Sequence, residues 1–199
     1  MKKFLILIVS VFLIEGAASA VTYNSDPKIF ISELVNDAMK TLNDKNASAE
    51  DKNKTIGKIA LENVDIKALG MYTLGDIRKN LDPETLNTYN ELFEKYFLKS
   101  LTSRLNDYRT TEFKVTNAEQ TSANYTMVKS IIPQTLSQPE VKIDWRVYTK
   151  NPTKPLIRDL IVEGLSLART QKEEFSSILN SNDNDINALF KTLEEFSKD

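Results

Sequence analysis

The spacing of apolar residues predicts two helices at the start of the folded chain. The first begins at Asp26-Pro27, where a carboxylate can cap the helix and a proline can occupy its first turn, and its apolar residues recur at steps of three and four as far as Leu42. The second follows a polar loop, is capped by Ser48 and carries a weaker apolar stripe to Val64. Both helices are amphipathic, so each needs an apolar partner surface.

The longest predicted helix begins at Asp82-Pro83 and extends to about Tyr108. It follows residues 65–79, which are expected to be irregular because two glycines interrupt them. Its apolar side chains gather on one face and are unusually aromatic: Leu86, Tyr89, Phe93, Tyr96, Phe97, Leu101, Leu105 and Tyr108. Such a face predicts a large apolar surface opposite this helix.

The period of the apolar pattern changes to two after Thr110, which predicts strands. Four strands, each with one apolar and one polar face, are expected over residues 113–116, 123–127, 141–148 and 156–162. Arg158 is the one charged residue on an apolar face, and two further helices are expected at about 169–179 and 186–196. The pattern predicts a single α+β domain over residues 21–199, a four-stranded antiparallel sheet with N- and C-terminal helices packed on it.

The first twenty residues predict a signal peptide rather than a part of the fold. Lys2-Lys3 precedes an apolar run over residues 4–14, and residues 18–20 match an A-x-A cleavage site. The apolar run is too short to cross the roughly 30 Å hydrocarbon layer of a bilayer as a helix. The chain is therefore expected to be exported. Since it has no cysteine for disulfides, the bacterial periplasm is the expected compartment.

The composition excludes several classes of function. The chain has 199 residues with neither histidine nor cysteine, so it lacks the imidazole and thiolate groups of the usual zinc, iron–sulfur and haem sites and of the common catalytic triads. Its 26 basic and 28 acidic residues nearly balance, which leaves no excess of cations for a nucleic-acid backbone. We therefore expect no metal, no cofactor and no nucleic-acid partner.

Carboxylates are the remaining candidates for acid–base catalysis. Asp144 and Asp159 lie on adjacent predicted strands, where the alternation directs both toward the polar face, as it does Arg146. A solvated face explains this arrangement better than an active-site pair. Ser166 has no neighbouring base that would activate it as a nucleophile. The chain is therefore not expected to be an enzyme.

The long aromatic helix and the apolar face of the sheet are expected to face each other. The pattern leaves open whether the space between them is a filled core or an apolar cavity for a hydrophobic ligand.

Motifs in both halves of the chain carry a family resemblance. Residues 63–75 contain Asn-Val-Asp-Ile-Lys-Ala-Leu-Gly and then a second Leu-Gly, and the aromatic helix opens with Leu-Asp-Pro-Glu at 81–84. In the second half, residues 141–147 are followed by 158–167, which contain an Asp, three residues, and then Glu-Gly-apolar-Ser-apolar. In this order the motifs resemble the MlaC family, the periplasmic phospholipid-binding components also called toluene-tolerance proteins. The resemblance covers roughly residues 26–196.

The resemblance implies a monomeric periplasmic shuttle for phospholipid. It implies transport between an outer-membrane lipoprotein–porin complex and an inner-membrane ABC transporter complex, which maintains the lipid asymmetry of the outer membrane. It also implies a cone of the nuclear-transport-factor type, with the acyl chains inside and the headgroup in water. The residues expected to line the cavity are Phe93, Phe97, Leu101, Leu105, Val115, Met127, Ile143, Val147, Leu160 and Val162.

Two other functions remain open at this point. One is an enzyme on the same cone-shaped scaffold that uses Asp144 or Asp159 as an acid or base. The other is a periplasmic protein-interaction module or chaperone with a filled core.

Overall fold

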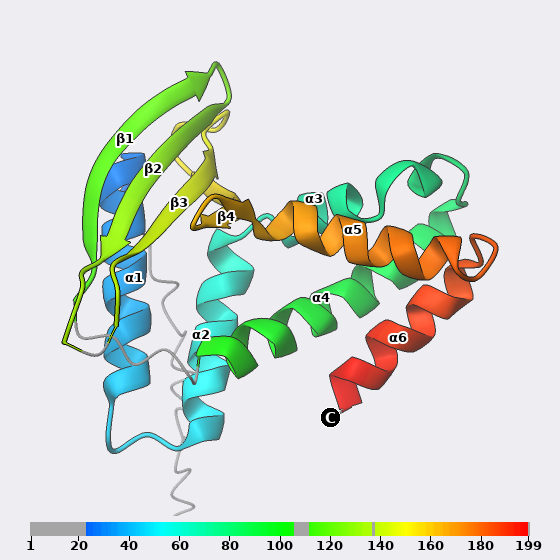
Figure 1. The fold of residues 1–199 in the computed structure, drawn as a ribbon, viewed down its shortest axis with the longest axis horizontal. Helices are drawn as coiled ribbons and strands as arrows, with labels where there is room; N and C mark the ends of the chain where they lie inside the picture. The colour runs from blue at the N-terminus through cyan, green and yellow to red at the C-terminus, as the bar shows by residue number, and fades with distance from the viewer. Residues whose placement is uncertain (1–22, 106–111, 137, 199) are drawn as a thin grey trace, which may run out of the picture.

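The computed structural model describes residues 23–105, 112–136 and 138–198 (Figure 1). The predicted signal peptide over residues 1–20 and the predicted helix end at Tyr108 lie outside the described residues. No helix in the described ranges is long and apolar enough to cross a membrane.

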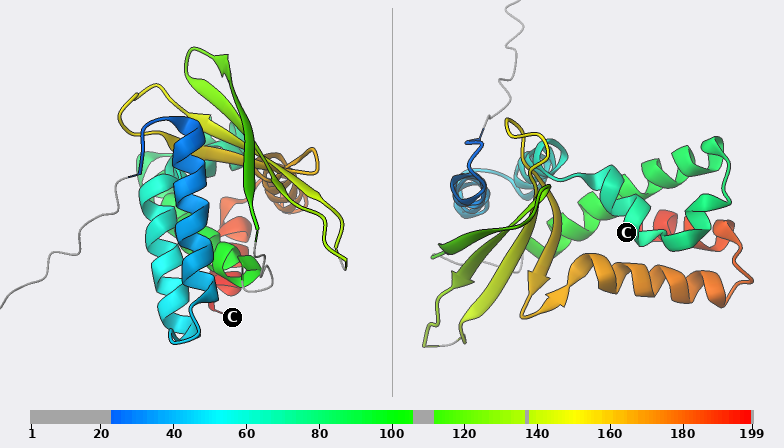
Figure 2. Two further views of the ribbon diagram at one scale, coloured as in Figure 1. Left: turned by 90° about the vertical axis from the view of Figure 1, so that its left-hand side faces the viewer. Right: turned by 90° about the horizontal axis from the view of Figure 1, so that it is seen from above.

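The first two helices begin at the residues that the sequence predicts. In α1 (Pro27–Asn43) the Asp26 carboxylate accepts hydrogen bonds from two N–H groups of the first turn, at 2.9 and 3.0 Å. In α2 (Ala49–Asn63) the Ser48 hydroxyl accepts a hydrogen bond from the Asp51 N–H and donates one to the Asp51 carboxylate. These caps satisfy N–H groups that have no partner inside the helix. Figure 2 shows α1 and α2 side by side.

The segment over residues 65–79 is helical, so the irregular backbone expected there is wrong. The Asp65 carboxylate caps α3 (Ile66–Thr73), which is followed by a short 3-10 helix, η1 (Gly75–Lys79). Only the second glycine of the segment acts as a helix end. Gly75 has a φ of 67°, a conformation that glycine adopts without strain.

Three longer helices, α4 (Pro83–Leu105), α5 (Leu167–Asn180) and α6 (Ile186–Lys198), pack with α3 into a helical part of the fold. Figure 1 shows this part extending to one side of the sheet. We call the buried side chains at its centre the helical cluster: Ile66, Leu74, Tyr89, Phe93, Phe175, Leu179, Leu189 and Leu193. In this cluster the Phe93 and Phe175 rings meet edge to face, 6.2 Å apart. The apolar surface opposite the aromatic helix is therefore formed largely by other helices rather than by the sheet.

Replacing Gly70 with alanine is expected to lower the free energy of unfolding by about 2 kcal/mol. Gly70 lies inside α3, where an added Cβ would come within 2.8 Å of the buried Phe93 ring. Its carbonyl also accepts a hydrogen bond from the buried Tyr89 hydroxyl at 3.1 Å, which a shift of α3 would lengthen. Urea unfolding measures the change.

Gly57 in α2 provides the matched control. A Cβ added at Gly57 meets nothing within 4 Å, and alanine has the higher helix propensity. Gly57→Ala should therefore raise the free energy of unfolding by up to about 1 kcal/mol. A loss of stability of the same size in both variants would contradict a steric cause at Gly70.

The other part of the fold is an antiparallel sheet in the order β1-β2-β3-β4-β5. Its strands are β1 (Lys114–Ser122), β2 (Tyr125–Ile132), β3 (Val141–Tyr148), β4 (Leu156–Val162) and β5 (Leu165–Ser166). The α+β class is confirmed, but the expected sheet of four strands is wrong, because β5 folds back on β4. The turn between them uses positive φ at Glu163 and Gly164. A strand of two residues is too short to leave an alternating pattern in the sequence.

Helix α1 packs against β1 and β2 and covers one face of the sheet (Figure 2). We call the buried side chains between them the sheet cluster: Phe30, Ile31, Leu34, Val128, Trp145, Val147 and Ile157. The Trp145 indole N–H donates a hydrogen bond to the buried Ser130 hydroxyl (2.8 Å), which donates in turn to the Ile143 carbonyl (2.8 Å). Val64, between α2 and α3, packs against both clusters, so the two apolar cores meet there.

Candidate functional site

Six of the ten side chains predicted to line a cavity lie in the two clusters or pack against them. Phe93 belongs to the helical cluster, and Phe97 packs against it. Leu101 is half-buried farther along α4, and the Leu105 side chain lies outside the described residues. Four strand residues belong to the sheet cluster or pack against it: Val115, Ile143, Val147 and Leu160. The structure thus brings these four strand residues together and places Phe93 elsewhere.

The strand register places several of the predicted residues on the face covered by α1. Val115 lies opposite Ser130, Ser130 opposite Ile143, and Ile143 opposite Val162. Residues directly opposite each other in an antiparallel sheet point to the same face. Leu160 lies on this face as well, because it is opposite Trp145 in the adjacent row. One continuous strip across the sheet therefore carries Val115, Ile143, Leu160 and Val162.

Met127 lies on the opposite face of the sheet. It is opposite Arg146, which is in turn opposite Asp159. The buried residues of β2 are instead Val128 and Ser130. The alternation gave the wrong phase for this strand because one of its two fully buried positions is a serine.

A β-bulge changes the phase of β4. Arg146 pairs with Asp159 while Val147 pairs with Ile157, so Arg158 is an extra residue with no opposite partner in β3. Ile157 is consequently buried in the sheet cluster, at 2% exposed, where the alternation predicts Leu156. Downstream of the bulge, the predicted phase is right for Leu160.

Burial separates the predicted residues into core and accessible side chains. Val147 is 0% exposed and Phe93 is 2% exposed, so protein atoms surround both. The half-buried members are Phe97, Leu101, Val115, Met127, Ile143, Leu160 and Val162. A half-buried apolar side chain can contact a ligand without leaving a packed core. The accessible apolar strip of the sheet is therefore the better candidate site.

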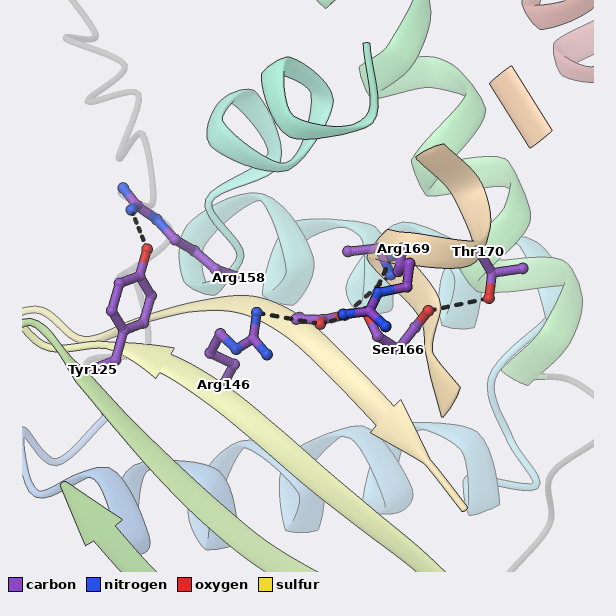
Figure 3. Close-up of polar contacts among 8 residues, drawn as sticks. Tyr125, Arg146, Arg158, Ser166, Arg169 and Thr170 are labelled. Atoms are coloured by element: carbon purple, nitrogen blue, oxygen red, sulfur yellow. Dashed lines mark hydrogen bonds and ion pairs between the residues drawn. The ribbon is translucent and has the colours of Figure 1, made fainter. Parts of the chain in front are cut away.

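A polar anchor at Asp159 fixes the start of α5, and Figure 3 labels its partners Arg146 and Ser166. The Asp159 carboxylate accepts hydrogen bonds from the Ser166 hydroxyl (2.7 Å) and the Ala168 N–H (3.0 Å), and it lies 3.8 Å from the Arg146 guanidinium. The Ser166 hydroxyl also accepts from the Arg169 N–H and so caps α5. Asp159 is 4% exposed, so its expected place on a solvated face is wrong.

The Asp159 anchor gives no support to acid–base catalysis. Both carboxylate oxygens of Asp159 accept hydrogen bonds within the protein. Asp144 lies opposite Ile161 rather than opposite Asp159, so the two carboxylates do not form a facing pair. The geometry supports a structural role for Asp159 instead of a role as an acid or base.

A second polar anchor uses the bulge residue Arg158 (Figure 3). Its guanidinium donates two hydrogen bonds to the Asp65 carboxylate (2.7 and 2.9 Å) and one to the Tyr125 hydroxyl (2.8 Å), and it lies 3.5 Å from the centre of the Tyr148 ring. Burial opposes the charge, but the hydrogen bonds to Tyr125 and Asp65 raise the pKa of Arg158 above its usual value. The Asp65 N–H also donates to the Ile157 carbonyl. This anchor ties β4 to the junction of α2 and α3.

The sequence prediction left α1 out of the candidate site. Phe30, Ile31 and Leu34 form the helical side of the sheet cluster, opposite the strip of strand residues. The spacing of Ile31 and Leu34 with the apolar residues that follow predicts an apolar face on this helix correctly, although it omits Phe30. What the spacing could not give was the partner of that face, which is the sheet.

The two anchors give a structural role to the sequence motifs. Asp65 comes from the first motif, and Arg158, Asp159 and Ser166 come from the second. The family model described as MlaC protein matches residues 32–195 of the chain. The chain belongs to the MlaC family. The predicted family resemblance is thus confirmed over most of the length of this MlaC chain.

The fold of this MlaC chain is similar to that of a solved structure. That structure is a phospholipid-binding protein from Ralstonia solanacearum in complex with a phospholipid. The two proteins share 17% sequence identity with a TM-score of 0.70, and the match covers 84% of this chain and 94% of the other. At this level of identity the likeness shows a common fold. No individually curated protein matches the MlaC chain significantly.

Proposed function

We propose that this chain is a periplasmic phospholipid carrier. It would move phospholipid between an inner-membrane ABC transporter complex and an outer-membrane lipoprotein–porin complex as a monomer, and so maintain the lipid asymmetry of the outer membrane. The observation that carries the proposal is the MlaC family match over residues 32–195. The predicted signal peptide and the phospholipid bound to the Ralstonia protein support it. The family match also favours a binding and transport protein over an enzyme.

The acyl chains are proposed to lie against the accessible apolar strip of the sheet. Val115, Ile143, Leu160 and Val162 carry this strip on the α1 side, and Phe97 and Leu101 on α4 are the accessible helical candidates. The support is chemical, because a hydrocarbon tail needs partly exposed apolar side chains and no charged groups among them.

The free energy of a lipid tail in water explains why a carrier is needed. A phospholipid with two ordinary chains has about 30 methylene groups, and at about 0.8 kcal/mol each their exposure to water costs about 24 kcal/mol. Free diffusion of the lipid through the periplasm is therefore negligible. A carrier must cover the tails nearly as well as a bilayer does, but no better, because it has to release them again.

Native mass spectrometry of the mature protein, purified without detergent, tests the proposal. We expect a mass increase that corresponds to about one phospholipid per chain, and lipid extraction then identifies the headgroup. A ligand-free mass that persists after incubation with liposomes would contradict the carrier proposal. That result would favour a periplasmic protein-interaction module or chaperone with a filled core.

A further inference from the structure

A surface groove of 640 Å³ lies between α3 and α5, and no member of either apolar cluster lines it. Its lining is polar apart from one aromatic ring and comprises Tyr72, Arg169, Lys172, Glu173, Ser176, Ser177, Asn180 and Ser181. Most of these residues follow one face of α5, and Tyr72 on α3 forms the other side. A polar groove on the outside of the helical part has no role in holding acyl chains.

Two cations line the groove, together with one carboxylate of the lining and the nearby Asp76, whose own ion pair is with Lys79. Neither Arg169 nor Lys172 forms an ion pair with a carboxylate among the described residues. The Lys172 ammonium lies 5.4 Å from the centre of the Tyr72 ring, and Tyr72 itself is 43% exposed. Glu173 is the single carboxylate of the lining. The groove thus combines two cations and an exposed aromatic ring.

We propose that this groove docks an acidic segment of a partner protein. Carboxylates of the partner would lie beside Arg169 and Lys172, and an apolar residue of the partner would cover Tyr72. The hydroxyl and amide groups of Ser176, Ser177 and Asn180 would bond to polar groups of the same segment. The chain as a whole has a net charge of −2, so this cationic groove also orients an acidic partner toward one face of the protein.

The lining of the groove favours a protein segment over a lipid surface. It is an open site made mostly by one polar face of α5, along which an extended or helical segment can lie. Binding of a peripheral protein to a bilayer also relies on several exposed apolar side chains, and Tyr72 is the one such side chain in the lining. Exposed charges give an attraction that weakens with salt, which suits a contact that forms and breaks repeatedly.

The docking proposal does not depend on the cargo of the protein. It concerns the outer surface of α3 and α5, whereas the proposed lipid site lies on the sheet. Lipid occupancy measured in the same samples therefore separates a failure of one proposal from a failure of the other.

The test is the double substitution Arg169→Glu and Lys172→Glu in the full mature chain. The probe is a fluorescein-labelled peptide of glutamates with one central leucine, and its binding is measured by fluorescence anisotropy at low and high salt. We expect the wild-type chain to bind this peptide at low salt and the double variant to bind it about tenfold more weakly or worse. High salt should weaken the wild-type complex. The melting temperature and the bound phospholipid should not change.

Lys150→Glu with Lys154→Glu is the matched control. It makes the same change in net charge at two exposed lysines of the turn between β3 and β4, and we expect peptide binding within about twofold of wild type. An equal loss in this control would overturn the proposal, since it would show an effect of net charge alone. The docking proposal would also be overturned if the wild-type chain failed to bind the glutamate peptide. A third outcome is that the wild-type chain binds phosphatidylglycerol vesicles and not the peptide, and that the Arg169/Lys172 variant loses this binding. That outcome would assign the groove to a lipid surface instead.

Discussion

Ile143→Glu is expected to remove most of the phospholipid that co-purifies with the protein while leaving the fold intact. Ile143 is half-buried in the apolar strip of the sheet, between Ser130 on β2 and Val162 on β4. A carboxylate at this position can remain hydrated in the free protein, but an acyl chain laid against it would bury the charge without a partner. The affinity for lipid should fall by about tenfold or more. Extracted phosphate per mole of protein measures the occupancy, and circular dichroism measures the fold.

Met127→Glu is the control, because Met127 lies on the opposite face of the sheet beside Arg146. It should retain the lipid content of the wild-type protein. Val147 is unsuitable for this test, since it is 0% exposed and a glutamate there would disrupt the sheet cluster itself. Full lipid occupancy in Ile143→Glu, or an equal loss in Met127→Glu, would refute the proposed position of the acyl chains.

Asp159→Ala is expected to lower the free energy of unfolding by about 3 kcal/mol. The substitution leaves the Ser166 hydroxyl and the Ala168 N–H without their buried acceptor, and it removes the counter-charge of Arg146. The first turn of α5 and the end of β4 both depend on this carboxylate. Urea unfolding followed by circular dichroism measures the loss.

Asp144→Ala provides the comparison for Asp159→Ala. Asp144 lies on the same face in the neighbouring strand but is only half-buried, so its loss should change stability by less than about 0.5 kcal/mol. Similar effects of the two substitutions would show that Asp159 does not act as an anchor. Loss of an enzymatic turnover is not expected from either change.

The features that the sequence predicted correctly are those determined by nearby residues. Asp26 and Ser48 cap their helices through N–H groups two or three positions away, and both helix starts are confirmed. In β3 the alternation places Ile143, Trp145 and Val147 on one face, and all three contribute to the sheet cluster. These signals need no knowledge of the partner elements.

The features that the sequence missed depend on the partner strand or helix. Ser130 is buried because a tryptophan on the next strand donates to its hydroxyl, so the polarity of Ser130 concealed the true phase of β2. The bulge at Arg158 is set by its bonds to Asp65, which is 93 positions away in the chain. Gly70 was expected to interrupt the helix, whereas it lies inside α3 and leaves room for the Phe93 ring. The position of the aromatic helix also depended on the other helices, which the spacing alone could not place.

The division of the interior into two apolar cores has a consequence for spectroscopy. The chain contains a single tryptophan, and Trp145 lies in the sheet cluster, whereas the aromatic residues of the helical cluster are tyrosine and phenylalanine. Indole emission therefore reports on the sheet cluster, while the far-ultraviolet signal reports on the helices of both cores, α1 included. Coincident transitions in the two signals identify a single cooperative unit, and separate transitions show that the two cores unfold independently. The native sequence thus carries an optical label for one half of its interior without any engineered probe.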